Sequence, residues 1–358
     1  MGTRARSTTA GGGAALGGPE GPATTAPGGP TTLVTTTPAA LGPLAELAQA
    51  ARARARASRA QRTLDLYAAA WARYDAWRSS AGLEAASAQT LALYLEARAQ
   101  AGRRVATIEL DLAAVRAALQ ARGTPLPPLR DPACEGLWRV LEGIRRTVGE
   151  AQRQAAPLGP AELQRALERD GVVPGATVTL RQLRDRALLL VGFGAALRRS
   201  ELVALEVADL DFSAEGMTLA IRRSKTDQTA KGAQVAVHAG QRPTTCPVRA
   251  VRDWLGAAKI IEGPVFRQIR SNGTLGPEAL TAQMVSIVVK HAAVSAGLDP
   301  AGYSGHSLRA GLATTAAQAG KRLDVIMTQG RWLRAETVQK YIRRATLFDD
   351  NASEGIGL

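Results

Sequence analysis

The sequence predicts a mainly α-helical protein with one small antiparallel β-sheet. Three observations lead to this prediction. Apolar residues recur at helical spacing over residues 58–148, short alternating segments follow between residues 207 and 238, and helical patterns then return as far as Tyr341. The 358 residues, 46% of them hydrophobic, are enough for two domains with separate cores. We therefore expect an all-α first domain and an α+β second domain.

Residues 1–45 consist mainly of Gly, Pro, Thr and Ala, with almost no clustering of aromatic or β-branched residues. Such a segment buries too little apolar surface to offset the entropy of ordering it. Its arginines and hydroxyl residues are also typical of organelle transit peptides, but it has no amphipathic period. We expect a disordered tail.

Residues 58–148 show the pattern of a small helical bundle. Apolar and aromatic side chains recur at steps of three and four along its first helix, namely Leu64, Tyr67, Trp71, Tyr74 and Trp77. Ser87 and Thr107 lie at the expected starts of two further helices, and a fourth runs from about Pro132 to Val148. The polar stretch 149–156 predicts a linker.

Residues 157–349 form the expected second domain, and residues 350–358 a C-terminal tail. Its first predicted helices are 160–169 and 181–195, and its predicted strands are 207–212, 217–223 and 233–238. The segment from Thr226 to Gly232 is a polar hairpin loop. Helices then return at Pro247, over Pro277 to Gly297, over His306 to Gly320, and in the segment that ends at Tyr341.

The charge balance favours a polyanionic partner. The chain has 45 Lys and Arg against 31 Asp and Glu, a formal net charge of +14. An excess of this size is typical of proteins that bind nucleic acid.

Cysteine usage and hydropathy exclude several classes of protein. Cys134 and Cys246 form no C-x-x-C pair, which argues against a disulfide framework or a zinc site and favours a reducing compartment. No stretch approaches the roughly 18 apolar residues of a membrane span, and the N-terminus lacks an apolar signal core. We expect no membrane association and a cytoplasmic location.

Two short motifs carry side chains suited to phosphate chemistry. Residues three apart in a helix share a face, so Arg198 is expected beside Glu201, and His306 beside Arg309. A guanidinium group binds phosphoryl oxygens bidentately and keeps its charge. Arg198 and Arg309 are therefore candidate clamps for a phosphoryl transition state, and Tyr341 offers a hydroxyl nucleophile.

The candidate residues follow one another in the order seen in the tyrosine recombinase (phage integrase) family: Arg198, Glu201, Lys225, the His306 to Arg309 quartet, Trp332 and Tyr341. The sequence most resembles the Cre-like members of that family, over about residues 58–349. The signal is the joint order and spacing, since H-x-x-R alone is weak. The resemblance implies a SAM-like core-binding domain over 58–148 and a tyrosine recombinase catalytic domain over 157–349.

The resemblance also implies a reaction. Tyr341 would attack the scissile phosphate, which gives a 3′-phosphotyrosyl link and a free 5′-hydroxyl. Lys225 would protonate the leaving oxygen, Trp332 would donate its indole N–H to a phosphate oxygen, and Glu201 would support an arginine or His306. A tyrosine titrates near about pH 10, so its hydroxyl needs nearby cations or a proton acceptor.

The residues of the chain also predict that it works without a cofactor. The sequence has no P-loop, and its three histidines form no cluster with carboxylates, so we expect neither ATP nor a metal. The phosphotyrosyl bond keeps the free energy of the phosphodiester, so religation needs no external energy source.

Double-stranded DNA is the expected partner, which would place the chain at the nucleoid. The candidate DNA-contacting residues are basic and lie mostly in the first domain: Arg59, Arg62, Arg103, Arg104, Arg145, Arg146 and Arg223. Leu347 and Phe348, near the polar end of the chain, suggest docking on a neighbouring copy. The resemblance implies a tetramer on two recombination sites.

Two other functions fit the same residues. A type IB topoisomerase uses a similar set to swivel one strand, although the predicted N-terminal bundle and Trp332 favour a recombinase. A non-catalytic DNA-binding protein of the same fold would bind without forming a covalent link. Taken singly, each arginine is as well explained as a solvated surface charge, and Tyr341 or Trp332 as a packing aromatic.

Overall fold

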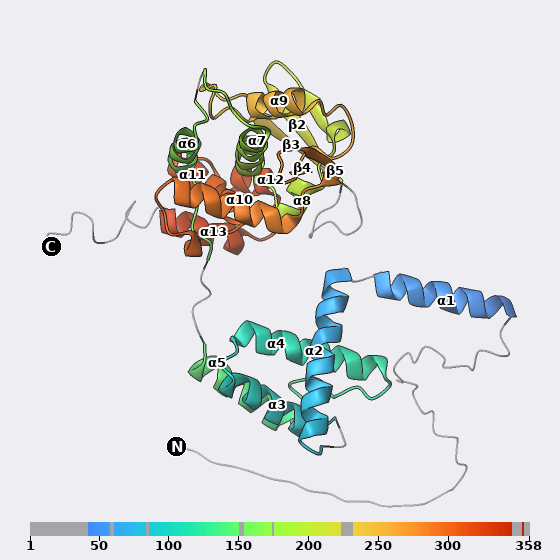
Figure 1. The fold of residues 1–358 in the computed structure, drawn as a ribbon. Helices are drawn as coiled ribbons and strands as arrows, with labels where there is room; N and C mark the ends of the chain where they lie inside the picture. Colours follow the sequence, from blue (N-terminus) through green and yellow to red (C-terminus); the bar gives the residue numbers. More distant parts are fainter. Residues whose placement is uncertain are drawn as a thin grey trace, which may run out of the picture. The chain divides into compact units, whose positions relative to one another are not determined.

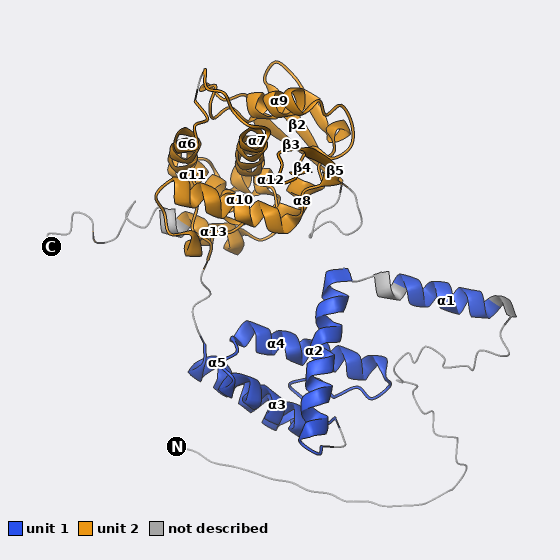
Figure 2. Ribbon diagram, in the orientation of Figure 1, with its two compact units in different colours: residues 1–151 blue, residues 152–358 orange. Residues whose placement is uncertain are grey.

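The computed structural model describes residues 42–57, 61–83, 86–149, 154–173, 175–222, 232–345 and 353. The chain divides into two compact units, residues 1–151 and 152–358 (Figure 2). Both are mainly helical, and the strands form small antiparallel sheets, so the predicted fold class is confirmed. In the parts of the chain that the structure describes, every helix is too short or too polar to span a bilayer.

Unit 1 is entirely helical in its described residues. Its elements in chain order are α1 (Gly42–Ala57), α2 (Gln61–Ser80), α3 (Ala88–Gln100), α4 (Val105–Ala121), the short 3₁₀ helix η2 (Pro132–Cys134) and α5 (Glu135–Thr147). Helix α1 begins inside the segment 1–45 that we expected to be disordered, because the Ala, Leu and Glu residues from Leu44 onward favour a helix. As predicted, Ser87 caps α3, its hydroxyl accepting a hydrogen bond from the Thr90 N–H at 3.1 Å.

Aliphatic side chains and two tyrosines form the core of unit 1. In this unit α2 packs against α4 and α3 against α5 (Figure 1). Tyr74 is fully buried, and its ring meets the Tyr94 ring edge-on at a centroid distance of 5.2 Å. The helical stripe predicted the burial of Tyr74. It did not predict Asp111, a fully buried carboxylate that accepts from Arg73 at 2.7 Å and from Arg98 at 3.0 Å.

Unit 2 combines helices with two small sheets. Its elements are α6 (Pro160–Arg169), α7 (Leu180–Gly194), α8 (Arg199–Val203), η3 (Val207–Asp209), β1 (Leu210–Phe212), β2 (Gly216–Ile221), β3 (Ala233–His238), α9 (Pro247–Ala258), β4 (Arg267–Ile269), β5 (Leu275–Ala279), α10 (Ala282–Ser295), η4 (Pro300–Gly302), α11 (Ser307–Gln318), α12 (Leu323–Gly330) and α13 (Ala335–Ala345). Helix α7 packs against both α9 and α11, and its side chains contribute most to the core (Figure 1).

The larger sheet has the order β1-β2-β3, with antiparallel neighbours. Met217 pairs with Val237 and Leu219 with Val235, so alternate residues of both strands face the core. The predicted strand 207–212 is shorter than expected. Residues 207–209 form η3 instead, because the Asp209 carboxylate accepts from the Glu206 N–H at 2.9 Å and closes a turn.

The second sheet, a hairpin of β4 and β5, was not predicted. Pro277 lies in β5 and does not begin a helix, so the predicted start of the helix over Pro277 to Gly297 is wrong. A proline has no N–H to donate and is tolerated in an edge strand. Helix α10 starts only after Thr281, whose hydroxyl caps it.

The first turn of α11 packs between α7 and the segment around Leu158, which follows the expected linker. Leu158 donates its N–H to the Ser307 carbonyl at 3.1 Å, and a Cβ at Gly311 would overlap the Leu158 carbonyl. On the α7 side, a Cβ at Gly192 would come within 2.6 Å of the Leu308 side chain. These glycines allow the close approach that fixes the position of Arg309.

Gly311→Ala should lower the stability of unit 2 by about 2 kcal/mol, because the added methyl group forces α11 away from Leu158. Urea unfolding of wild type and variant measures the difference. Gly256→Ala in α9 is the matched control, because no atom lies within 4 Å of its new Cβ and alanine favours a helix. A Gly311→Ala variant as stable as this control would contradict the described packing.

Candidate active site

The candidate site is built around α8, whose N-cap residue is Arg198. The Arg198 N–H donates to Glu201 Oε2 at 2.9 Å, and its Nη1 donates to Glu201 Oε1 at 2.6 Å. The Glu201 side chain is 1% exposed and that of Arg198 15%. The predicted pairing of these two residues across one helical turn is thus present.

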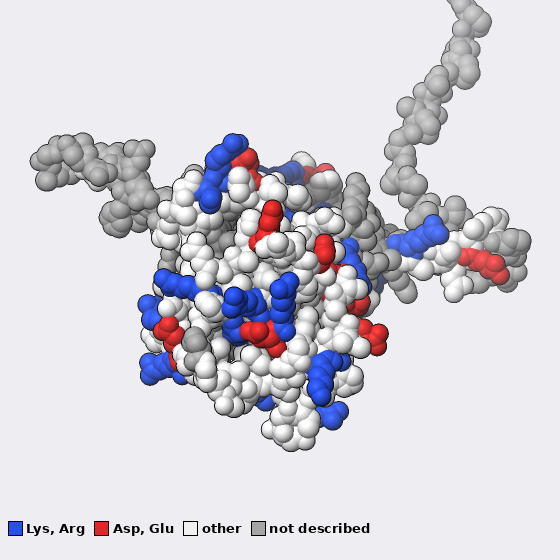
Figure 3. Space-filling view, turned by 90° about the horizontal axis from the view of Figure 1, so that it is seen from above, with Lys and Arg blue, Asp and Glu red and all other residues white. Residues whose placement is uncertain are grey.

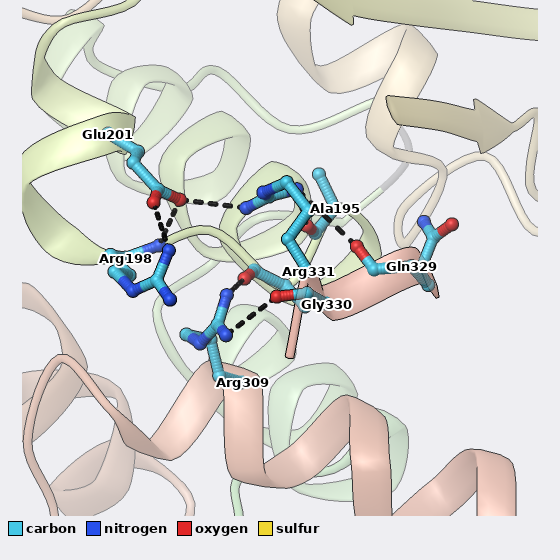
Figure 4. A network of polar contacts seen from close by, with 8 residues as sticks. Ala195, Arg198, Glu201, Arg309, Gln329, Gly330 and Arg331 are labelled. Carbon is cyan, nitrogen blue, oxygen red and sulfur yellow. Dashed lines mark hydrogen bonds and ion pairs between the residues drawn. The ribbon is translucent and has the colours of Figure 1, made fainter. Parts of the chain in front are cut away.

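Arg309 lies in the first turn of α11 and is buried. Its Nη2 donates to the Gly330 carbonyl at 2.7 Å, and its Nη1 donates to the Ala196 carbonyl (Figure 4). Burial, followed by the charge of Arg198, lowers the pKa of Arg309 to about 10. The group therefore remains a cation at neutral pH.

Arg331 is a member of the site that the sequence analysis missed. It ends α12 in the left-handed conformation, with φ 54° and ψ 46°, which costs a non-glycine residue about 1 kcal/mol. Its Nη2 donates to Glu201 Oε2 at 2.7 Å, and its side chain is 12% exposed (Figure 4). Its neighbour Trp332 was a candidate from the sequence, but nothing local linked Arg331 to a partner 130 residues away.

Glu201 is ionised between these two arginines. Burial by itself raises its pKa, but the hydrogen bond from the Arg198 N–H and the charges of Arg331 and Arg198 outweigh burial. The net result is a pKa below the ordinary value of 4.5. We call Arg198, Arg309 and Arg331 the guanidinium cluster. With one carboxylate among three cations, it keeps two positive charges in a largely buried place.

Trp332 and Tyr341 lie next to the cluster. The Arg309 guanidinium carbon is 4.5 Å from the Trp332 ring centre, and the Trp332 and Tyr341 ring centroids are 6.4 Å apart. Gly330 permits this packing, because a Cβ there would overlap the Trp332 ring. Tyr341 is half-buried on α13, in a small cluster formed by α11, α12 and α13.

Gln329 fastens this end of α12 to the rest of unit 2. Its Nε2 donates to the Gly194 carbonyl at 2.8 Å and to the Ala236 carbonyl at 3.0 Å. The first belongs to the end of α7 and the second to β3. The turn that carries Arg331 and Trp332 is therefore held by two other elements.

His306 differs from Arg309 in its surroundings. It is the N-cap residue of α11, one position before the helix begins, and its side chain is exposed whereas that of Arg309 is buried. The shared face that we expected from their spacing is therefore only partly present. Lys225 and Arg223 lie outside the described residues, between Arg222 and Gly232, so the structure does not place the candidate general acid.

The candidate DNA-contacting residues of unit 1 differ in their ion pairs. Arg62, Arg103, Arg104 and Arg146 are exposed, whereas Arg59 lies outside the described residues. Arg145 is engaged by Glu109 and Glu142, each at 2.6 Å, so part of its charge is already compensated. On the face shown in Figure 3, basic side chains lie beside acidic ones and form no continuous patch.

Metal ligation finds no support in the described part of the chain, which contains no group of three or more His, Cys, Asp or Glu side chains suited to hold an ion. The donors of the site are instead guanidinium groups, an indole N–H and a phenol. This set binds and neutralises an anion with two or more oxygens, as a phosphate has.

Glu201→Gln should make unit 2 less stable at neutral pH by about 1–3 kcal/mol, because three charge-assisted hydrogen bonds are weakened or lost. The folded-state pKa of Glu201 lies below its ordinary value of 4.5. The stability advantage of wild type should therefore be complete above that value and disappear as the pH falls through the folded-state pKa. Urea unfolding between neutral and acidic pH measures it. The exposed Glu215→Gln is the control, and an advantage independent of pH would contradict the assignment.

Residues 175–347 match the phage integrase family. The integrase/recombinase xerD homolog of Selenomonas ruminantium is 33% identical over 305 residues, which cover 84% of this chain and 87% of that protein. The recombinase cre of Escherichia phage P1 is 26% identical over 269 residues, which cover 70% of this chain and 73% of the phage protein.

Solved structures show the same fold. The XerH site-specific recombinase bound to palindromic difH substrate, in a post-cleavage complex, aligns with a TM-score of 0.54 and 18% identity, covering 75% of this chain and 70% of that one. A lambda integrase (75–356) dimer bound to a COC′ core site aligns with a TM-score of 0.52 and 17% identity, covering 86% and 95%. With the extent of the xerD homolog match, these comparisons show that the chain belongs to the phage integrase family, the tyrosine recombinases.

Proposed function

We propose that this chain is a site-specific recombinase that cuts and rejoins double-stranded DNA through a covalent link to Tyr341. The observation that carries the proposal is a pair of contacts: Arg309 lies against the Trp332 ring, and the Trp332 ring lies beside the Tyr341 ring. It brings a candidate nucleophile next to a buried site with two net positive charges. The family membership supports the same reaction.

In the proposed cleavage step, the Tyr341 hydroxyl gives its proton to His306, its oxygen attacks the phosphorus, and the bond to the 5′ oxygen breaks. The products are a 3′-phosphotyrosyl link and a 5′-hydroxyl, whose proton Lys225 supplies. In the rejoining step a 5′-hydroxyl attacks the phosphotyrosine and releases the phenol. One phosphate ester replaces another in each step, so neither ATP nor a metal has to enter the balance.

The arginines have donors to spare for the phosphate. A guanidinium group carries five N–H donors. In the described residues, the hydrogen bonds given above occupy Nη1 of Arg198 and both terminal nitrogens of Arg309 only once each. The remaining donors suit the non-bridging oxygens, and the Trp332 indole N–H suits one of them as well. The exposed His306 suits proton movement at the rim of the site.

We assign DNA contact outside the active site to the helical domain over residues 58–148, with residues 157–349 as the catalytic domain. The exposed Arg62, Arg103, Arg104 and Arg146 are the described candidates for phosphate contacts. Relatives of the same fold were crystallised on DNA, as the XerH complex and the lambda integrase dimer show for those proteins. Affinity should therefore fall as salt rises.

Tyr341→Phe should abolish the covalent adduct and leave DNA binding unchanged, because only the attacking oxygen is removed. The substrate is a library of nicked duplexes with a randomised core. Cleavage beside the nick releases a short fragment that carries the new 5′-hydroxyl, and without this fragment the cut strand cannot be rejoined. Adducts are detected on denaturing gels in excess EDTA, and mass spectrometry identifies the modified residue. Tyr303→Phe, in the same unit, is the matched control. An adduct with Tyr341→Phe, or none with wild type, would overturn the proposal.

Four copies should assemble on two DNA sites. Complete exchange between two duplexes cuts four strands, and each chain supplies one Tyr341, so four nucleophiles are needed. The complex is formed with excess duplex that carries the core sequence cleaved in the nicked library. Its mass, measured by light scattering, should equal four chains with two duplexes. Exchange products formed by a complex of two chains would contradict this stoichiometry.

A further inference from the structure

Arg331 occupies a backbone position that suits a glycine. It is the C-cap residue of α12 and has a positive φ, where a side chain is disfavoured. Gly330 precedes it directly, so the turn is already tightly built. The contacts of its side chain should therefore explain why an arginine stands there.

Those contacts lead to Glu201. Arg331 Nη2 lies 2.7 Å from Glu201 Oε2, while Arg198 Nη1 lies 2.6 Å from Glu201 Oε1. All three side chains are largely buried, at 12%, 1% and 15% exposure for Arg331, Glu201 and Arg198. One carboxylate is thus divided between two guanidinium groups, one on each oxygen.

This division changes the charge that Arg198 presents. A carboxylate that pairs with a single guanidinium group neutralises it and fixes it in a two-pronged geometry. If residue 331 were a glycine, Glu201 would pair with Arg198 alone among the partners described here. The cluster would then keep one net positive charge instead of two.

The second charge matters for the reaction. A phosphodiester carries one negative charge, and attack by a phenolate adds another, so the charge of the reacting group grows toward the transition state. A preorganised cation stabilises such growing charge most effectively in a site with little water. Arg198 serves this purpose only while Glu201 does not cancel it.

We propose that Arg331 is a positioning residue, which shares Glu201 with Arg198 and so leaves the positive charge of Arg198 uncompensated and available to the scissile phosphate. This inference rests on the proposed function. Arg331 itself acts through Glu201 and Arg198. A purely structural role, in which Arg331 only ties α12 to α8, makes a different prediction for the double variant described next.

The test compares the single-turnover cleavage rates of wild type and variants on one nicked duplex, whose core sequence is the one that wild type cleaves in the library. Arg331→Gly should slow cleavage by about ten- to a hundredfold. Arg331→Lys, which keeps the charge without the planar fork, should restore part of the rate. In Arg331→Gly/Glu201→Gln the uncharged amide no longer cancels Arg198, so this double variant should cleave faster than Arg331→Gly alone.

The control is Arg322→Ala at the other end of α12, which removes one positive charge from a side chain that is 81% exposed. It should cleave at the wild-type rate. Thermal unfolding and gel-shift affinity check each variant, and if Arg331→Gly fails to fold, the comparison is made between the uncharged Arg331→Gln and Arg331→Gln/Glu201→Gln.

A double variant no faster than its Arg331 parent, or Arg331→Gly cleaving at the wild-type rate, would overturn the inference while leaving the proposed function intact. Absence of any adduct from wild type, by contrast, would overturn the proposed function itself.

Discussion

The site depends on keeping like charges close together in a buried place. Arg198, Arg309 and Arg331 repel one another, and burial lowers the pKa of both Arg309 and Arg331. Glu201 is the described anion among them, and its ion pairs to Arg198 and Arg331 offset much of this cost. What remains is an excess of positive charge with little water around it, which an anion of the right shape relieves on binding. The repulsion between these guanidinium groups therefore favours binding of an anion such as phosphate.

Neutral partners hold the same arrangement in place. The carbonyl groups of Ala196 and Gly330 accept from Arg309, and Gln329 binds the turn of α12 to α7 and β3. Carbonyl oxygens orient a guanidinium group without cancelling its charge, unlike a carboxylate. In unit 1 a carboxylate, not a carbonyl group, holds the arginines: the fully buried Asp111 pairs with Arg73 and Arg98. Removing Asp111 would leave both arginines without this partner. That pairing stabilises a core, whereas the excess charge in unit 2 is suited to a ligand.

The sequence predicted the local features of this protein well. The spacing of Arg198 and Glu201, the aromatic stripe through Tyr74 and the cap at Ser87 each depend on residues within one or two helical turns, and the structure contains all three. The family and the mainly helical fold class are confirmed. The misses involve partners far apart in the chain. Pro277 was taken for the start of a helix because its pairing with β4 is not a local property, and Arg331 was overlooked because Glu201 lies 130 residues away and the left-handed turn that aims it has no local signature.

The two hydrogen bonds of Gln329 also have a mechanical consequence. The Gln329 side-chain nitrogen donates to carbonyl groups at the end of α7 and in the middle of β3, and Gln329 lies two residues before Arg331. Any displacement of β3 relative to α7 must stretch one of these bonds or drag the end of α12 with it. A movement of the sheet that preserves these two hydrogen bonds would therefore also shift the guanidinium cluster.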